Sequence, residues 1–149
     1  MAACCLLLPL LLAGCGDRAI PHEAVVRAWG DAVATGEDER AATLLAPGAI
    51  VIQGDRELTL RTEEDAIAWN AEISCAASVR KITTHQDIVT VTYRLGHREP
   101  GSCQVPGGTL ISEFEVRGEK IVFYRELALT PPGTDVPSGF VPPPAATTP

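Results

Sequence analysis

The chain has 149 residues, with 12 Lys or Arg against 19 Asp or Glu and a formal net charge of −7. Nucleic-acid binding depends on clustered basic residues that neutralise phosphates, and the sequence contains no such cluster, so nucleic acid is excluded as a partner. The same balance excludes charge-driven attachment to anionic lipids. A chain of this length is expected to build one hydrophobic core.

The N-terminal segment is an uncharged apolar run that ends in Leu12-Ala13-Gly14-Cys15. Residues 1–15 are too few for a membrane-spanning helix, which needs about 20 apolar residues, and Pro9 disfavours a core helix. The length suits the hydrophobic region of a signal peptide. The ending resembles the lipobox of bacterial lipoproteins, in which cleavage precedes a lipidated cysteine. An ordinary secretory signal is the alternative.

The lipobox resemblance implies a signal peptide over residues 1–14 and lipidation of Cys15. It also implies an extracytoplasmic location, with the protein anchored by lipid to the bacterial cell membrane or envelope. A lipidated tether over 15–20, a folded domain over 21–130 and a proline-rich disordered tail over 131–149 complete the expected organisation.

Apolar spacing and turn residues predict helices first and strands afterwards. The first expected elements are a helix from Pro21 to Gly36, a helix over 37–46 and a hairpin of strands 49–53 and 57–60 around Gly54-Asp55. A third helix is expected over 63–74; it opens with a capping box of Thr62 and Asp65 and ends at Cys75. Four strands follow, over 77–85, 87–95, 108–117 and 120–130.

The two cysteines beyond Cys15 are Cys75 and Cys103. A hairpin of the strands 77–85 and 87–95 is centred near Gln86, which places position 75 opposite about position 97. The loop that follows contains Cys103, so the two thiols are within reach of each other. An exported compartment permits disulfides, and we therefore predict a Cys75–Cys103 bridge rather than two free buried thiols.

Helices followed by a meander of strands predict an α+β domain with its helices on one face of a curved sheet. The stretches AWGDAVATGEDERAATLLAPGAIVIQG and FEVRGEKIVFYREL resemble the opening and the closing hairpin of the NTF2-like superfamily, which includes SnoaL-like polyketide cyclases and ketosteroid isomerases. The resemblance covers residues 22–130. It implies a cone of three N-terminal helices packed on a curved antiparallel sheet of about five to six strands, with a mostly apolar pocket.

The resemblance also aligns three positions with the polar groups of the isomerase site. Trp29 stands where the isomerase has a tyrosine, Gln53 where it has the carboxylate base, and Ser112 where it has a buried acid. An amide cannot act as a base, so isomerase chemistry is not expected. We expect these residues to belong to a ligand pocket, without a catalytic residue, a cofactor or a metal.

Asp55 and His97 remain as weak catalytic candidates. A Gly-Asp pair is more often turn chemistry, and the His97-Arg98-Glu99 segment is more often a solvated charged loop. Our hypothesis is a lipid-anchored extracytoplasmic module that binds a small hydrophobic ligand or an envelope protein without catalysis. The alternative is an NTF2-like enzyme of isomerase, cyclase or hydrolase type acting on a hydrophobic small molecule. A homodimer through the sheet face is a further expectation.

Overall fold

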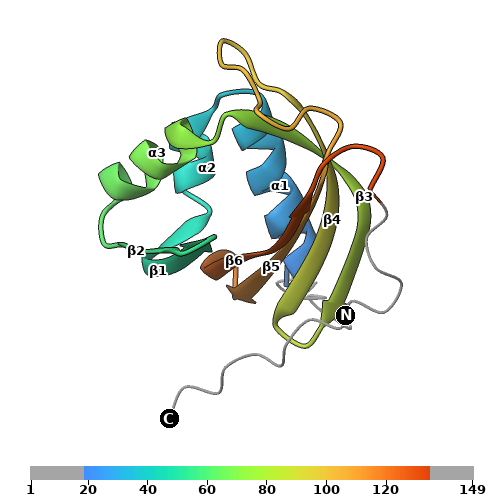
Figure 1. Ribbon diagram of the computed structural model, residues 1–149. Coiled ribbons are helices and arrows are strands. Elements are labelled where there is room, and N and C mark those ends of the chain that lie inside the picture. The colour runs from blue at the N-terminus through green and yellow to red at the C-terminus, as the bar shows by residue number, and fades with distance from the viewer. Residues whose placement is uncertain (1–18, 135–149) are drawn as a thin grey trace, which may run out of the picture.

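The computed structural model describes residues 19–134. Three helices and six strands form one layer of helices on a curved sheet (Figure 1). The elements are α1 (His22–Ala34), α2 (Asp38–Ala42), β1 (Leu45–Gln53), β2 (Arg56–Leu60), α3 (Glu63–Glu72), β3 (Cys75–His85), β4 (Ile88–His97), β5 (Thr109–Arg117) and β6 (Lys120–Thr130). The expectations on the signal peptide, on Cys15 and on most of the proline-rich tail lie outside the described residues.

The sheet has the strand order β2-β1-β6-β5-β4-β3. Four of the pairs are antiparallel, and the pair of β1 with β6 is parallel, with Val51 opposite Tyr124. The α+β class, the three helices and the six strands are as predicted, but the sheet is mixed, so a wholly antiparallel sheet was wrong. The other neighbours are consecutive strands joined by a turn or a loop at one end of the sheet, which imposes antiparallel pairing, whereas β1 and β6 are not consecutive in the chain.

The boundary between α2 and β1 also differs from the prediction of a helix over 37–46. The helix ends at Ala42, and β1 begins at Leu45, which lies opposite Ile121 of β6. Between Leu45 and Ile50 the register shifts, so Pro47, which has no N–H to give to a ladder, lies within the irregularity. Pairing with β6 therefore overrides the local helix signal.

The helix α3 begins as predicted. The Thr62 side chain accepts a hydrogen bond from the Asp65 N–H at 3.2 Å, and Asp65 Oδ2 accepts one from the Thr62 N–H at 3.0 Å. This reciprocal capping box satisfies two backbone donors that the first turn would leave free. The helix ends at Glu72, so Cys75 opens β3 and does not end the helix as predicted.

The β3–β4 hairpin has the predicted register from Cys75 to Val79, and a shift between Val79 and Lys81 offsets the pairs nearer the tip by one residue. Cys75 lies opposite His97, and His85 lies opposite Ile88 across a turn in which Gln86 has a φ of 56°. This register brings Cys103 to Cys75, and the predicted disulfide is present with a Cα–Cα distance of 4.5 Å. The bridge fastens the loop that joins β4 to β5.

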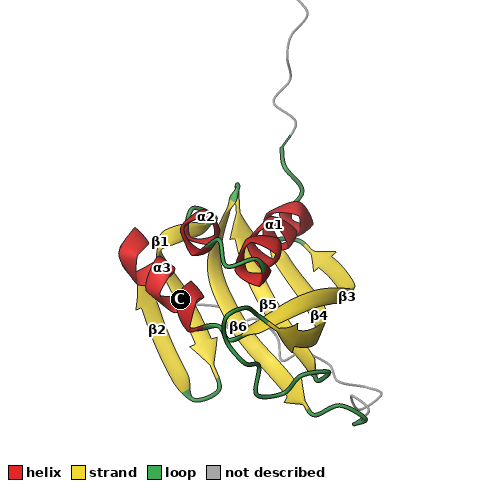
Figure 2. Ribbon diagram, turned by 90° about the horizontal axis from the view of Figure 1, so that it is seen from above, coloured by secondary structure: helices red, strands yellow, loops and turns green. Residues whose placement is uncertain are grey.

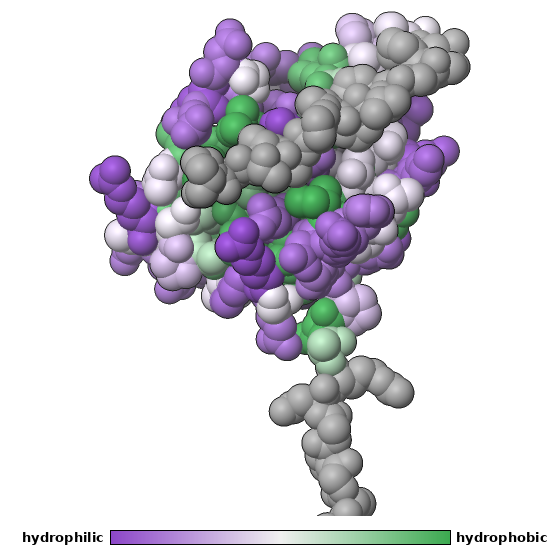
Figure 3. Space-filling model, turned by 90° about the horizontal axis from the view of Figure 1, so that it is seen from below, coloured by the Kyte–Doolittle hydropathy of each residue, from purple (hydrophilic) through white to green (hydrophobic). Residues whose placement is uncertain are grey.

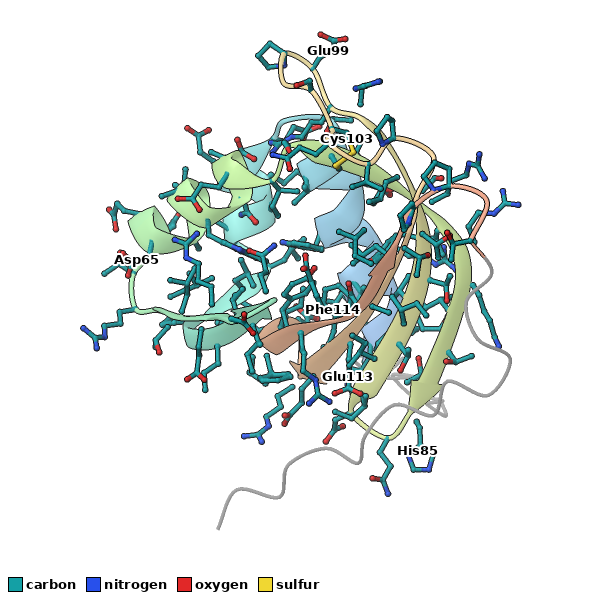
Figure 4. All side chains as sticks on the ribbon, in the orientation of Figure 1. Asp65, His85, Glu99, Cys103, Glu113 and Phe114 are labelled. Atoms are coloured by element: carbon teal, nitrogen blue, oxygen red, sulfur yellow. A yellow bond between two sulfur atoms is a disulfide. The ribbon has the colours of Figure 1, made fainter. Side chains whose placement is uncertain are left out.

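The hydrophobic core lies between the helices and the concave face of the sheet (Figure 2). Phe114 points into this layer from β5, whereas its neighbour Glu113 points to the opposite face (Figure 4). Trp29, Trp69, Phe114 and Tyr124 form one aromatic cluster with ring centroids between 5.1 and 5.8 Å apart. Seen from below, hydrophilic residues cover most of the visible described surface (Figure 3).

Candidate functional site

A cavity of about 190 Å³ lies between α1, the end of α3 and the strands of the sheet. Its walls are mainly apolar and aromatic. The lining residues are Trp29, Gly30, Val33, Gln53, Glu72, Ile73, Ser74, Cys75, Ala77, Tyr93, Leu95, Leu110, Tyr124, Glu126 and Leu129. Three of them, Glu72, Ser74 and Leu129, are exposed and mark the mouth of the cavity.

A chain of hydrogen bonds crosses the wall of the cavity. The indole N–H of Trp69 donates to Gln53 Oε1 at 2.8 Å. Because an indole nitrogen only donates, this bond fixes the orientation of the Gln53 amide. The amide nitrogen therefore faces β6, where Gln53 Nε2 donates to Glu126 Oε1 at 3.1 Å. Gln53 serves as a positioning group for a carboxylate.

A second donor reaches the same carboxylate oxygen. The Tyr124 hydroxyl donates to Glu126 Oε1 at 3.3 Å, and it lies 3.3 Å from Ser112 Oγ. Since the phenol has one proton, Ser112 is the donor in the second contact. Burial raises the pKa of Tyr124 well above its ordinary value of 10, with the Glu126 carboxylate as a further cause. The phenol therefore stays protonated as a hydrogen-bond donor.

Tyr93 is a buried polar residue of the cavity wall that lacks a hydrogen-bond partner in the described part of the chain. Its side chain comes from β4 and is 3 % exposed, and within residues 19–134 its hydroxyl makes no hydrogen bond. Burial raises the pKa of this phenol as well. An unpaired buried hydroxyl costs free energy, so a ligand that bonds to it gains more than one that leaves it unpaired.

The charged residues among the described lining residues are Glu72 and Glu126, both acidic. Glu72 lies at the mouth, and its Oε2 is 2.8 Å from Arg56 Nη1 in a solvent-exposed ion pair. Glu126 is half-buried, and within the described chain it is in no ion pair. None of the described lining residues is Lys, Arg or His. Within residues 19–134, the Glu126 carboxylate is therefore held by neutral donors alone.

The structure separates the residues singled out from the sequence. Trp29 and Gln53 line the cavity, whereas Ser112 lies fully buried behind Tyr124 and contacts the site through that hydroxyl. Asp55 and His97 are exposed and are not among the lining residues. The Nδ1 atom of His97 instead accepts a hydrogen bond from the Cys103 N–H at 3.3 Å.

Sequence reasoning missed Glu126. It compared polar positions on α1, β1 and β5, while the carboxylate stands on β6 and reaches Gln53 through the parallel β1–β6 pair. A usable signal was present, because Tyr124 and Glu126 are two residues apart and so share one face of a strand.

Arg98 was expected in a solvated loop and is instead 6 % exposed. Its Nη1 donates to the carbonyl oxygens of Asn70 and Ile73, each at 2.7 Å, and its Nη2 donates to Asp38 Oδ1. These contacts tie the β4–β5 loop to α2 and to the end of α3. We call this group the Arg98 clamp.

Residues 19–134 contain no group of three or more His, Cys, Asp or Glu side chains arranged to hold a metal ion. Within the same residues, no helix combines the length and the apolar character needed to span a membrane.

Comparison of the sequence with family models and with curated proteins finds no match. Solved structures do match. An NTF2-like protein of unknown function from Cytophaga hutchinsonii is 12% identical, with a TM-score of 0.58 over 74% of this chain and 92% of that chain. The fold is NTF2-like.

Two further similar structures come from proteins described as SnoaL-like or ketosteroid isomerase-like, the two groups to which the sequence was compared above. A protein described as a SnoaL-like polyketide cyclase from Jannaschia is 19% identical, with a TM-score of 0.58 over 75% of this chain and 90% of that chain. A protein from Catenulispora acidiphila with a ketosteroid isomerase-like fold, in complex with trimethylamine, is 19% identical, with a TM-score of 0.56 over 70% and 84%. At these identities the NTF2-like likeness concerns the fold alone.

Proposed function

We propose that the protein is a lipid-anchored extracytoplasmic module that binds a small hydrophobic ligand in the cavity without catalysis. The observation that carries the proposal is the cavity of about 190 Å³ with largely apolar and aromatic walls. An apolar cavity of ~150 Å³ is known to accept benzene, so this one suits a ligand of roughly eight non-hydrogen atoms.

Ligand binding is tested by mass spectrometry of small molecules that copurify with the detergent-extracted protein. Ala77→Phe adds an aromatic ring at a lining position and is expected to remove the copurifying ligand. The matched control is Ala76→Phe, because Ala76 is the preceding residue of β3 and is not among the lining residues. Equal ligand content in both variants would contradict the proposal.

Lipid anchoring is supported by the lipobox resemblance, and an extracytoplasmic compartment is supported by the disulfide, which persists in oxidising surroundings. Cys15→Ser is expected to leave the chain uncleaved or to release it from the membrane, because stable anchoring needs two or more acyl chains. Detergent partitioning and the mass of the mature chain are the measurements. Cys5→Ser, within the expected signal peptide, is the control, and Cys15→Ser behaving like it would contradict the anchor.

The macromolecular partners stay predictions. Binding to an envelope protein is tested by crosslinking in intact cells. Formation of a homodimer through the sheet face is tested by light scattering of the purified protein. A monomer at micromolar concentration would contradict the dimer.

A second candidate is an NTF2-like enzyme that acts on a hydrophobic small molecule. Glu126 favours it, because a carboxylate in an apolar cavity beside a phenol donor can act as a general base. The test is deuterium exchange at carbon next to a carbonyl in a panel of small ketones, followed by NMR. A binding module leaves the exchange rate at its buffer value. Acceleration that Glu126→Gln abolishes would instead establish catalysis.

A further inference from the structure

We infer that the cavity selects a small organic cation, an amine with an apolar body, and that Glu126 is its charge partner. This inference rests on the proposed binding function and assigns the chemical class of the ligand.

The first argument is the incomplete compensation of the Glu126 charge. Both of its described hydrogen bonds, from Gln53 and Tyr124, end on Oε1. Hydrogen bonds from two neutral donors stabilise a carboxylate less than an ion pair with a cation does. Both bonds are to Oε1, so the Oε2 atom of Glu126 is still available as an acceptor. A half-buried charge without a counter-ion is costly, and an ammonium group placed in the cavity supplies the missing partner.

The second argument is the chemistry of the rest of the wall. Trp29, Tyr93 and Tyr124 all line the cavity, and aromatic rings attract organic cations through their quadrupoles. The buried Tyr93 hydroxyl has no partner in the described chain and can accept an N–H bond from an amine. Both phenols remain neutral because burial raises their pKa, so the anionic partner for the amine is the Glu126 carboxylate and not a phenolate.

The third argument is the exclusion of anions. An incoming carboxylate or phosphate meets the unpaired Glu126 charge and no Lys, Arg or His among the described lining residues, while Glu72 at the mouth is already paired with Arg56. The formal net charge of −7 adds repulsion of the same sign over the whole chain. An anionic ligand of suitable size is therefore disfavoured by the charge of the cavity.

The test compares three probes that share one ring and differ in charge: benzylamine, benzyl alcohol and benzoate. Each is titrated into the mature, detergent-extracted protein by calorimetry, and its free concentration is corrected for its own partition into the detergent micelles, which is measured without protein. We expect benzylamine to bind at least about 10-fold more tightly than benzyl alcohol, with benzoate weakest, as expected for one charge-assisted contact.

Matched variants locate the selectivity. Glu126→Gln is expected to lower benzylamine affinity to that of benzyl alcohol and to leave benzyl alcohol unchanged. Glu72→Gln removes the other lining carboxylate, which is already paired with Arg56, and is expected to change no affinity more than about twofold. A Glu126→Gln protein that keeps the full preference for benzylamine would overturn the assignment of Glu126.

The order of the three probe affinities on the unaltered protein tests the inference by itself, even where the variants do not fold. Equal binding of benzylamine and benzyl alcohol, or tightest binding of benzoate, overturns the cation inference and leaves the binding function standing. Failure of all three probes to bind overturns the proposed binding function and the inference with it.

Discussion

Arg98 and Glu126 are both removed from full solvent contact, and the protein treats their charges differently. The Arg98 clamp gives the guanidinium an acidic partner, Asp38, and two backbone carbonyls. Glu126 receives two neutral donors on one oxygen and has no cation among its described contacts.

The difference indicates that the charge of Arg98 stabilises the fold, whereas the charge of Glu126 is suited to binding a ligand. A buried charge whose partners all come from the chain has nothing left to offer another molecule. Glu126 faces a cavity with part of its hydrogen-bonding capacity unused. The comparison predicts that variants at the clamp end of the molecule change stability, and that a variant at Glu126 changes binding.

The largest expected effect comes from the disulfide at the clamp end. Replacing both cysteines, Cys75→Ser with Cys103→Ser, opens a loop with a sequence separation of 28 residues and is expected to lower the free energy of unfolding by about 3.5 kcal/mol. Urea denaturation measures this loss. Thiol labelling of denatured, unreduced protein from its native compartment is the companion measurement, and two reactive thiols there would show that the bridge does not form.

Arg98→Ala is expected to cost about 3 kcal/mol, because it leaves Asp38 and two carbonyl groups without their partner. Arg40→Ala is the matched control. Arg40 pairs with Glu37 in the open, with 57% of its side chain exposed, and its loss should leave the urea midpoint unchanged. A stable Arg98→Ala protein that loses ligand would break the comparison by moving Arg98 into the site.

Alkaline pH offers a graded test of the cavity wall. Burial raises the folded-state pKa of Tyr93 and Tyr124 above the ordinary value of 10, so their stabilising effect is complete below pH 10 and is lost as the pH rises beyond it. Each tyrosine is expected to lower the free energy of unfolding by about 1.4 kcal/mol per pH unit above 10. Urea titrations at several alkaline pH values measure the slope.

The sequence has 2 tyrosines, so removing one of them is a control for the fall in unfolding free energy with pH. Tyr93→Phe is expected to halve the pH dependence. Tyrosinate absorbance that rises near pH 10 while the protein is still folded would contradict the burial of the phenols.

Glu126→Gln is expected to have the smallest effect on stability, within about 1 kcal/mol of the unaltered chain without ligand. The amide keeps an oxygen that can accept from Tyr124, and it removes a half-buried charge. The measurement is urea denaturation of the ligand-free protein. A loss as large as that of Arg98→Ala would place Glu126 among the charges that serve the fold.

Features that depend on neighbouring segments could be predicted from the sequence. The capping box of Thr62 and Asp65 follows from local cap chemistry, and the turn at Gln86 gives the register of the β3–β4 hairpin to within the one-residue shift after Val79. The Cys75–Cys103 bridge follows from that register. Each depends on residues less than about 30 positions apart.

The features that escaped prediction depend on distant pairing. The contact of Gln53 with Glu126 spans 73 residues and exists because β6 enters the sheet beside β1. The burial of Arg98 needs Asp38, 60 residues earlier in the chain. Alternation and turn residues describe each strand by itself, and they do not determine which strand lies next to it when no hairpin joins the two.

The direction of α1 sets the orientation of the cavity. The helix begins beside the tip of the β3–β4 hairpin, where the Thr84 hydroxyl donates to Glu23, and its later residues Trp29 and Val33 line the cavity. The chain thus enters the domain at the hairpin end, and the mouth lies toward the other end. Residues 15–20 can span at most about 20 Å. If Cys15 carries the proposed lipid, this tether keeps the hairpin end of the domain within about that distance of the bilayer, while the mouth lies at the far end of the domain.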